Sequence, residues 1–206
     1  MRRRIFRQVG QINRSNAVAL RGFWVKRAEN VQARCVNSFQ RDLFSVSQDI
    51  FGSDFMIKAE QAKQLFTEGY NCAQAVFIAF ADECGIDRQT AALISSGFGG
   101  GLGRMREVCG AVSGMSMAAS MLFGCGDPKN AGKKKEIYQT IQSLAGEFRN
   151  KNGSIICREL LGLDKNAATP PTPEARTPQY YKKRPCALLV YDAAEILEKY
   201  IEKCKE

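Results

Sequence analysis

Apolar residues recur at helical spacing from residue 56 onward, and no stretch of the chain alternates convincingly like a strand. The pattern predicts a first helix that Gly69 ends, then a second over 72–84. Asn71 is the expected N-cap of the second helix, and Gly85 follows its end. A third, short helix begins after Asp87, which can cap it.

The second half of the chain continues the helical pattern. A helix of small residues is expected from about 105 to 123, where Gly110 and Gly114 would let a neighbouring backbone come close. Residues 108–123 are apolar, but the stretch is too short and too interrupted to cross a membrane, so we expect a buried central helix and no membrane partner. An amphipathic helix follows and stops at Gly153.

The last third contains a proline-rich interruption. Ser154 is expected to cap a short helix, and residues 164–184, with four prolines, predict an extended surface loop. A final helix starts at Pro185 and runs toward Lys203. We therefore expect an all-α fold, a compact bundle of about six or seven helices with a glycine-rich loop.

Residues 1–55 differ from the rest of the chain, with scattered apolar residues and ten Lys or Arg against four Asp or Glu. Residues 56–206 hold twenty Lys or Arg and seventeen Asp or Glu, and we expect them to form the helical domain. We interpret 1–55 as an irregular basic extension outside the fold, either a transit-like segment or a start assigned upstream of Met56. A nucleic-acid-binding arm ranks last, because aromatic residues do not interleave regularly with its arginines. We expect a cytoplasmic protein, or an organellar one if 1–55 is a transit peptide, with no nucleic-acid partner.

The composition narrows the chemistry. The chain has no histidine, which excludes Ser–His and Cys–His nucleophile pairs and histidine-ligated metals. Eight cysteines without a visible secretory signal indicate redox chemistry or metal binding in a reducing compartment.

Four cysteines lie near predicted helix N-termini, where unpaired N–H groups and the helix dipole favour a thiolate. They are Cys72, Cys109, Cys157 and Cys186. Three of them have an arginine within three residues, which would act in the same direction: Arg106, Arg158 and Arg184. The other four suit the alternative of ordinary buried or surface thiols: Cys35, Cys84, Cys125 and Cys204.

The spacing of these four candidates leaves three functions open. They contain no CxxC and are 37, 48 and 29 residues apart, so any site must be assembled from four helices. They could cycle between thiols and disulfides with an unknown redox partner, as an oxidoreductase or electron-transfer protein. They could ligate an iron–sulfur cluster or another thiophilic metal. The third alternative is a helical interaction module with inert cysteines. Sulfurs in close pairs would favour thiol–disulfide cycling, and sulfurs that all lie within metal-ligand reach of one another would favour a metal or cluster site. Sulfurs dispersed over the fold would favour the interaction module.

The stretch "SGFGGGLGRMREVCGAVSG" over 96–114 matches neither G-x-G-x-x-G nor the P-loop pattern, which argues against a nucleotide site. Its glycines could still present N–H groups to an anion or to cluster sulfides, with a close-packed turn as the alternative. The candidate cofactor-binding residues are Gly99, Gly100, Gly101 and Gly103. Tyr70, Arg104, Arg106 and Glu107 border the candidate site and could tune it, although for Glu107 we favour a surface or capping role.

Four stretches resemble the family of redox-active proteins named for its C–GCAxxG–C–C pattern: "GYNCAQAV", "GFGGGLGRMREVCGAVSG", "CRELLG" and "CALLVYDAAEILEKY". Residue matching assigns the four family cysteines to Cys72, Cys109, Cys157 and Cys186. One departure is local, because glycine follows Cys109 here, where the family name places it before the cysteine. The resemblance implies redox activity, and a similar domain accompanies haem domains in split-Soret-type cytochromes. Covalent haem is excluded here, since the chain has no C-x-x-C-H motif and no histidine.

Overall fold

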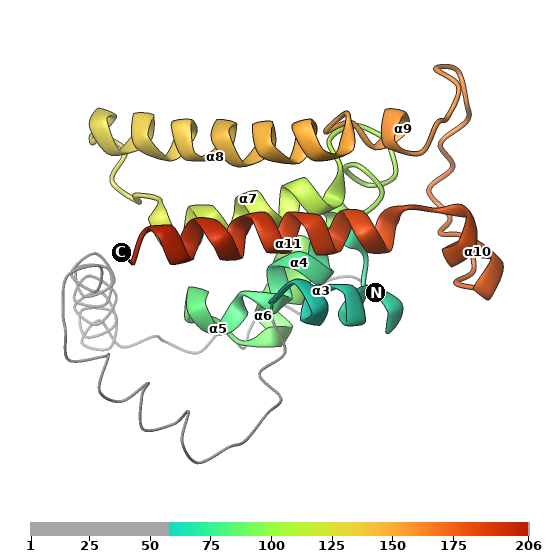
Figure 1. Ribbon diagram of the computed structural model, residues 1–206, viewed down its shortest axis with the longest axis horizontal. Helices are drawn as coiled ribbons and strands as arrows, with labels where there is room; N and C mark the ends of the chain where they lie inside the picture. The colour runs from blue at the N-terminus through green and yellow to red at the C-terminus, as the bar shows by residue number, and fades with distance from the viewer. Residues whose placement is uncertain (1–57, 206) are drawn as a thin grey trace, which may run out of the picture. The chain divides into compact units, whose positions relative to one another are not determined.

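The described part of the chain is built from helices stacked in three layers (Figure 1). The computed structural model describes residues 58–205. One outer layer is α8 (Ala131–Asn152), and the middle layer holds α7 (Gly110–Phe123) and α11 (Cys186–Lys203). The opposite layer contains α3 (Lys58–Thr67), α4 (Cys72–Ala79), α5 (Ala81–Cys84) and α6 (Arg88–Ser95). The predicted all-α fold is confirmed for these residues, whereas the predicted extension over 1–55 lies outside them.

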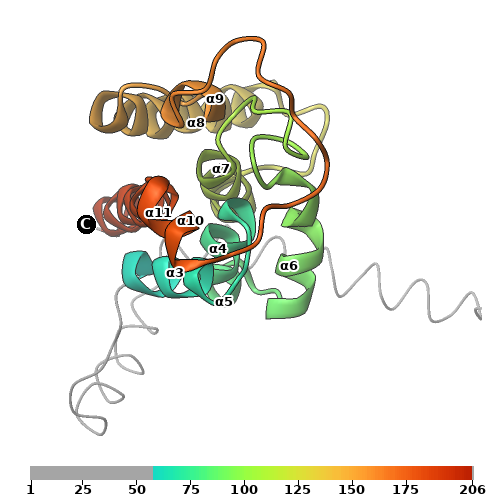
Figure 2. The same cartoon turned by 90° about the vertical axis from the view of Figure 1, so that its right-hand side faces the viewer.

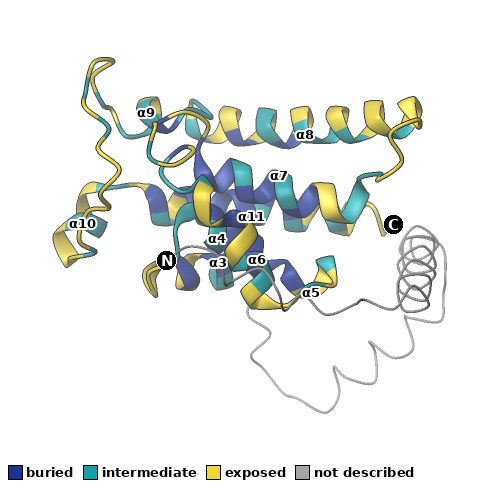
Figure 3. Cartoon of the chain, turned by 180° about the vertical axis from the view of Figure 1, so that it is seen from behind, coloured by how far each residue is buried: buried dark blue, intermediate teal, exposed yellow. Residues whose placement is uncertain are grey.

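The core lies where α4, α7 and α11 face one another, and Figure 3 colours the buried residues of these helices dark blue. Its largest side chains are each at most 1% exposed: Phe66, Phe77, Phe80, Met115, Leu144, Phe148 and Leu197. Burying such a side chain contributes about 1.5–3 kcal/mol. Gly114 brings α7 close to α4, since a Cβ there would lie 2.5 Å from the carbonyl oxygen of Ala73. The predicted close approach at Gly114 is therefore confirmed.

Most predicted helix ends are confirmed. Asn71 caps α4 in a capping box, accepting from the backbone N–H groups of Ala73 and Gln74. Asp87 caps α6, while Gly85 and Gly153 end their helices in the left-handed conformation. The predicted helix over 72–84 is two helices, α4 and α5, because the backbone departs from helical geometry at the buried Phe80.

Two boundaries around the glycine-rich loop differ from prediction. Helix α7 begins at Gly110 rather than near residue 105, because the preceding residues form successive tight turns. These turns contain residues with positive φ, some of which are not glycine: Gly100, Gly101, Leu102, Gly103, Arg104 and Arg106. The prediction that Ser154 caps a helix is also wrong, since the N-cap of α9 (Cys157–Leu160) is Ile156.

The proline-rich segment is not simply an extended loop. It contains α10 (Pro178–Lys183), whose first turn Thr177 caps by accepting a hydrogen bond from the Tyr180 N–H. The part between α9 and α10 arcs past the glycine-rich loop (Figure 2). Within the described residues, β-pairing is limited to one isolated antiparallel bridge, between Val108 and Ile156. The described helices include none that combines the length and apolar character needed to cross a bilayer.

Candidate functional site

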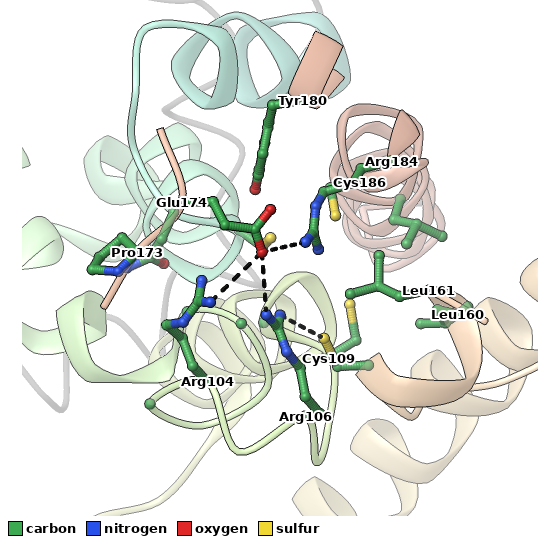
Figure 4. Close-up of a pocket in the computed structure, with 18 of the residues that line it drawn as sticks. Arg104, Arg106, Cys109, Leu160, Leu161, Pro173, Glu174, Tyr180, Arg184 and Cys186 are labelled. Atoms are coloured by element: carbon green, nitrogen blue, oxygen red, sulfur yellow. Dashed lines mark hydrogen bonds and ion pairs between the residues drawn. The ribbon is translucent and has the colours of Figure 1, made fainter. Parts of the chain in front are cut away.

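All four predicted cysteines line one pocket of about 260 Å³. Cys72, Cys157 and Cys186 are the first residues of α4, α9 and α11, and Cys109 is the N-cap residue of α7. Four helix N-termini therefore meet at this pocket, part of which is shown in Figure 4. Three of the cysteines are buried, and Cys72 is half-buried.

The glycines allow the cysteine-bearing elements to come this close. A Cβ on Gly99 would lie 2.6 Å from the Asn71 side chain, which caps the helix of Cys72. A Cβ on Gly101 would lie 2.7 Å from the Cβ of Cys157, and one on Gly110 would lie 3.1 Å from the Cβ of Cys72. The predicted close approach at Gly110 is thus confirmed.

Of the four glycines proposed to bind a cofactor, three line the pocket: Gly99, Gly100 and Gly103. Gly101 does not, and instead packs under Cys157.

Paired backbone segments place Cys109 and Cys157. The Cys109 N–H donates to the Ile155 carbonyl at 2.8 Å, and the Cys157 N–H donates to the Glu107 carbonyl at 2.7 Å. These bonds flank the bridge between Val108 and Ile156. The pairing is long-range, so no helical pattern in the sequence could reveal it.

Cys72 and Cys186 affect each other's protonation. The Cys72 thiol and, after it, the Arg184 guanidinium lower the pKa of Cys186 to about 7, against the opposing effect of burial. The same interaction, together with burial, raises the pKa of Cys72 well above its usual range. Cys186 is therefore the more acidic thiol of the two, and Cys72 stays protonated at neutral pH.

The other two cysteines are held as thiols. Burial raises the pKa of Cys109 to about 12, although backbone N–H groups at the start of α7 oppose the shift. Burial also raises the pKa of Cys157, against the opposing effect of Arg106, whose Nη1 lies 4.0 Å from the Cys157 sulfur. Burial thus opposes the thiolate that the helix N-termini favour at Cys109 and Cys157, and at Cys72 the interaction with Cys186 opposes it first, followed by burial.

Arginine side chains surround the sulfurs. Arg104, Arg106, Arg176 and Arg184 line the pocket. Arg158, which we expected to act on Cys157, instead donates to the carbonyl oxygens of Asp164 and Ala167.

Two of these arginines have unusual backbone conformations. Arg104 has a φ of 68° and Arg106 a φ of 66°. For a residue with a Cβ this costs on the order of 1 kcal/mol each. Gly100 leaves room for both, since a Cβ there would lie 3.0 Å from Arg104 Cγ and 3.5 Å from Arg106 Nη1.

Part of the site lies in the segment that was predicted to be an extended surface loop. Glu174, Arg176 and Tyr180 all line the pocket. Arg176 donates to the carbonyl oxygens of Phe66 and Tyr70 and stacks on the Tyr180 ring, 5.0 Å from its centroid. Thr-Pro at 177–178 was the available signal of a helix start, but nothing local shows that this segment packs on the cysteines.

The remaining candidates lie off the pocket. Tyr70 and Glu107 do not line it, and both contribute backbone groups to the contacts described above. Three cysteines assigned to ordinary roles are likewise outside it: Cys84, Cys125 and Cys204. Cys35 lies outside the described residues.

The fit to a metal centre is mixed. Four sulfur donors on one pocket are chemically suited to iron–sulfur clusters or zinc, and neighbouring arginines would offset the negative charge of a thiolate cluster. Within residues 58–205, however, no group of three or more Cys, Asp or Glu side chains is arranged to hold a metal ion. The donor set fits, whereas the arrangement of these side chains is not that of a formed metal site.

A family model described as "Putative redox-active protein (C_GCAxxG_C_C)" matches residues 70–200, which include all four pocket cysteines. No curated protein and no solved structure matches the chain significantly.

Proposed function

Because the chain belongs to the C_GCAxxG_C_C family of redox-active proteins, we propose that Cys72 and Cys186 cycle between two thiols and a disulfide. The observation that carries this proposal is that both cysteines line one pocket together with four arginines. A nucleophilic thiolate beside a thiol is the arrangement that thiol–disulfide exchange requires.

The exchange balances without any further cofactor. The Cys186 thiolate attacks one sulfur of a substrate disulfide, the substrate S–S bond breaks, and one substrate thiolate leaves. Cys72 then gives up its proton and attacks the Cys186 sulfur, which releases the second substrate thiol. The substrate gains two electrons and becomes two thiols, and the protein dithiol becomes a disulfide. A dithiol reductant closes the cycle by the reverse exchange.

Cys109 and Cys157 complete the proposed set of four redox cysteines. Burial keeps both protonated, so they do not start the exchange. Their position on the same pocket lets them receive the disulfide from the first pair by a second exchange. In this reaction a disulfide bond moves from one cysteine pair to the other with no net change in electrons.

A second candidate function is binding of an iron–sulfur cluster. The observation that favours it is that four thiols and four arginines line one pocket. Such a group would supply one-electron transfer, with the four cysteines as its ligands.

One experiment separates the two functions. The full-length chain is purified anaerobically, and its visible spectrum, iron and acid-labile sulfide are measured. A colourless, metal-free protein that forms a Cys72–Cys186 disulfide on treatment with a small disulfide would support thiol exchange. Broad visible absorption with iron and sulfide would replace that proposal with the cluster.

Matched variants show whether the pocket cysteines carry the reaction. Cys186→Ser should abolish the disulfide that non-reducing peptide mapping detects, and Cys72→Ser should leave a mixed disulfide trapped on Cys186. Cys125→Ser, outside the pocket, should react like the unaltered chain. Equal reactivity of all three variants would refute the proposal.

A further inference from the structure

A carboxylate from outside the helical core reaches into the arginines of the cysteine pocket. One oxygen of Glu174 lies 2.5 Å from Arg184, 3.6 Å from Arg104 and 3.9 Å from Arg106 (Figure 4). The Glu174 side chain is 48% exposed, whereas these three arginine side chains are 7–18% exposed. A solvent-exposed group of the segment between α9 and α10 thus fills a largely buried cationic site. We call Arg104, Arg106 and Arg184 the arginine cradle.

One carboxylate does not neutralise the pocket. Arg176 also lines it, and Glu174 is the one acidic residue among the described residues that do so. Buried charges are costly unless they are paired, and the excess of arginine leaves this pocket net positive even when Cys186 is a thiolate. An anionic ligand that enters it would find charge partners already in place.

The backbone conformations indicate that the cradle is a built feature. Arg104 and Arg106 both hold positive φ, and Gly100 makes the space through which their side chains reach the pocket. Strained backbone at non-glycine residues concentrates at ligand sites, where surrounding structure maintains it. An ordinary surface ion pair with Glu174 would not require two arginines with positive φ.

We propose that the arginine cradle binds the anionic group of the substrate, and that Glu174 occupies the cradle in its absence. The substrate class is a small disulfide that carries a carboxylate, and this deepens, and rests on, the proposed thiol–disulfide function. A carboxylate is the anion that the cradle already holds, in the form of Glu174. The pocket volume of about 260 Å³ restricts the substrate to a molecule smaller than most drug-sized ligands.

The cradle orients the exchange. Arg106 connects the two parts of the site, with Nη1 at 4.0 Å from the Cys157 sulfur and Nη2 at 3.9 Å from the Glu174 carboxylate. A substrate carboxylate bound in place of Glu174 would therefore bring its disulfide to the sulfurs. Cys186 attacks one substrate sulfur, the substrate S–S bond breaks, and Cys72 displaces the second substrate thiol from Cys186. The substrate is reduced by two electrons, and the cysteine pair is oxidised by two.

The test compares three small disulfides of similar size and different charge: dithiodiglycolate, 2-hydroxyethyl disulfide and cystamine. Their rates of reaction with the full-length reduced chain are measured by following formation of the Cys72–Cys186 disulfide. Each rate is divided by the rate at which the same disulfide reacts with a small free thiol in solution. This removes differences in the intrinsic reactivity of the three disulfides. We expect the anionic compound to react about tenfold or more faster than the neutral one, and the cationic compound to be slowest. Equal normalised rates would overturn the proposal while leaving thiol exchange intact.

Variants test the role of each charge. Glu174→Gln should increase the preference for the anion several-fold, because it removes the competing carboxylate. Arg104→Gln should reduce that preference toward the neutral compound, and Arg149→Gln, exposed on α8, should leave it unchanged. If Glu174→Gln lowers the preference or leaves it unaltered, Glu174 is a structural counter-ion and the proposal fails.

A redox-inert ligand separates this proposal from the proposed function. Binding of glutarate, a dicarboxylate without sulfur, is measured by calorimetry to the full-length chain and to its Glu174→Gln variant. Saturable binding that tightens in the variant supports the cradle even if no disulfide reacts. Reaction with disulfides without glutarate binding, or without any preference for the anion, supports only the cysteine chemistry and refutes the cradle.

Discussion

The reactivity of Cys186 should depend on one hydrogen bond from Cys72. With a pKa of about 7, about half of Cys186 is thiolate at neutral pH. At the ordinary cysteine pKa of about 8.5 the fraction would be roughly 3%. The Cys72 thiol is the largest cause of this shift, so Cys72→Ala removes the main stabilisation of the thiolate.

The magnitude follows from the chemistry of the contact. A hydrogen bond to a charged group contributes about 1.5–3 kcal/mol, and one pKa unit corresponds to about 1.36 kcal/mol. Cys72→Ala should therefore raise the pKa of Cys186 by about 1–2 units, to roughly 8–9. Cys72→Ser retains a hydroxyl that can donate, so its shift should stay below about 0.5 units.

The assay is the pH dependence of iodoacetamide alkylation at Cys186, followed by peptide mass spectrometry on the full-length chain. The midpoint is the correct readout, because a thiolate of higher pKa is intrinsically more nucleophilic. At pH 7 that compensation would limit the loss of rate to roughly 2–6-fold. A wild-type midpoint near 8.5, or equal midpoints for the Ala and Ser variants, would refute the reasoning.

Two further predictions concern stability and are read from urea or thermal unfolding. Lys151→Met should destabilise the fold by about 1–3 kcal/mol, because Lys151 pairs at 2.8 Å with Asp192, whose side chain is only 3% exposed. Lys199→Ala, which removes an exposed ion pair, should cost less than about 1 kcal/mol. Equal losses of stability in Lys151→Met and Lys199→Ala would show that the burial of Asp192 is not what makes the first pair important. Gly114→Ala should cost about 1–3 kcal/mol, since its Cβ would lie 2.5 Å from a backbone oxygen. Gly146→Ala, whose Cβ would have nothing within 4 Å, should instead stabilise α8 by about 0.5–1 kcal/mol. If both glycine substitutions changed the free energy of unfolding in the same direction, crowding at Gly114 would not explain its effect.

Local signals predicted much of the fold. Asn71 and Asp87 cap helices because their side chains reach N–H groups two or three residues away. Gly85 and Gly153 end helices because they adopt a left-handed backbone without a Cβ. Interactions of this range are encoded within one helical turn, so a single sequence contains them.

The same local reasoning failed where a distant segment decides the conformation. Helix α7 starts at Gly110 because the residues before it bond to the segment that leads into α9. Glu174 looked like part of a solvent-exposed loop, yet its carboxylate meets three arginines of the pocket. Hydrophobic periodicity is a local pattern, so it does not predict contacts between residues so far apart in the chain.

The cysteines show this division most clearly. The sequence alone placed Cys72, Cys109, Cys157 and Cys186 at or beside helix N-termini, and the family pattern marked the same four. Only the tertiary structure decided which two of them shift each other's pKa and which side chains are desolvated. Helix ends act on a thiol through neighbouring N–H groups, whereas burial and the effect of Cys72 on Cys186 depend on how four separate helices pack. The sequence therefore indicated which sulfurs line the pocket, and packing determined that Cys186 has the lowered pKa among them.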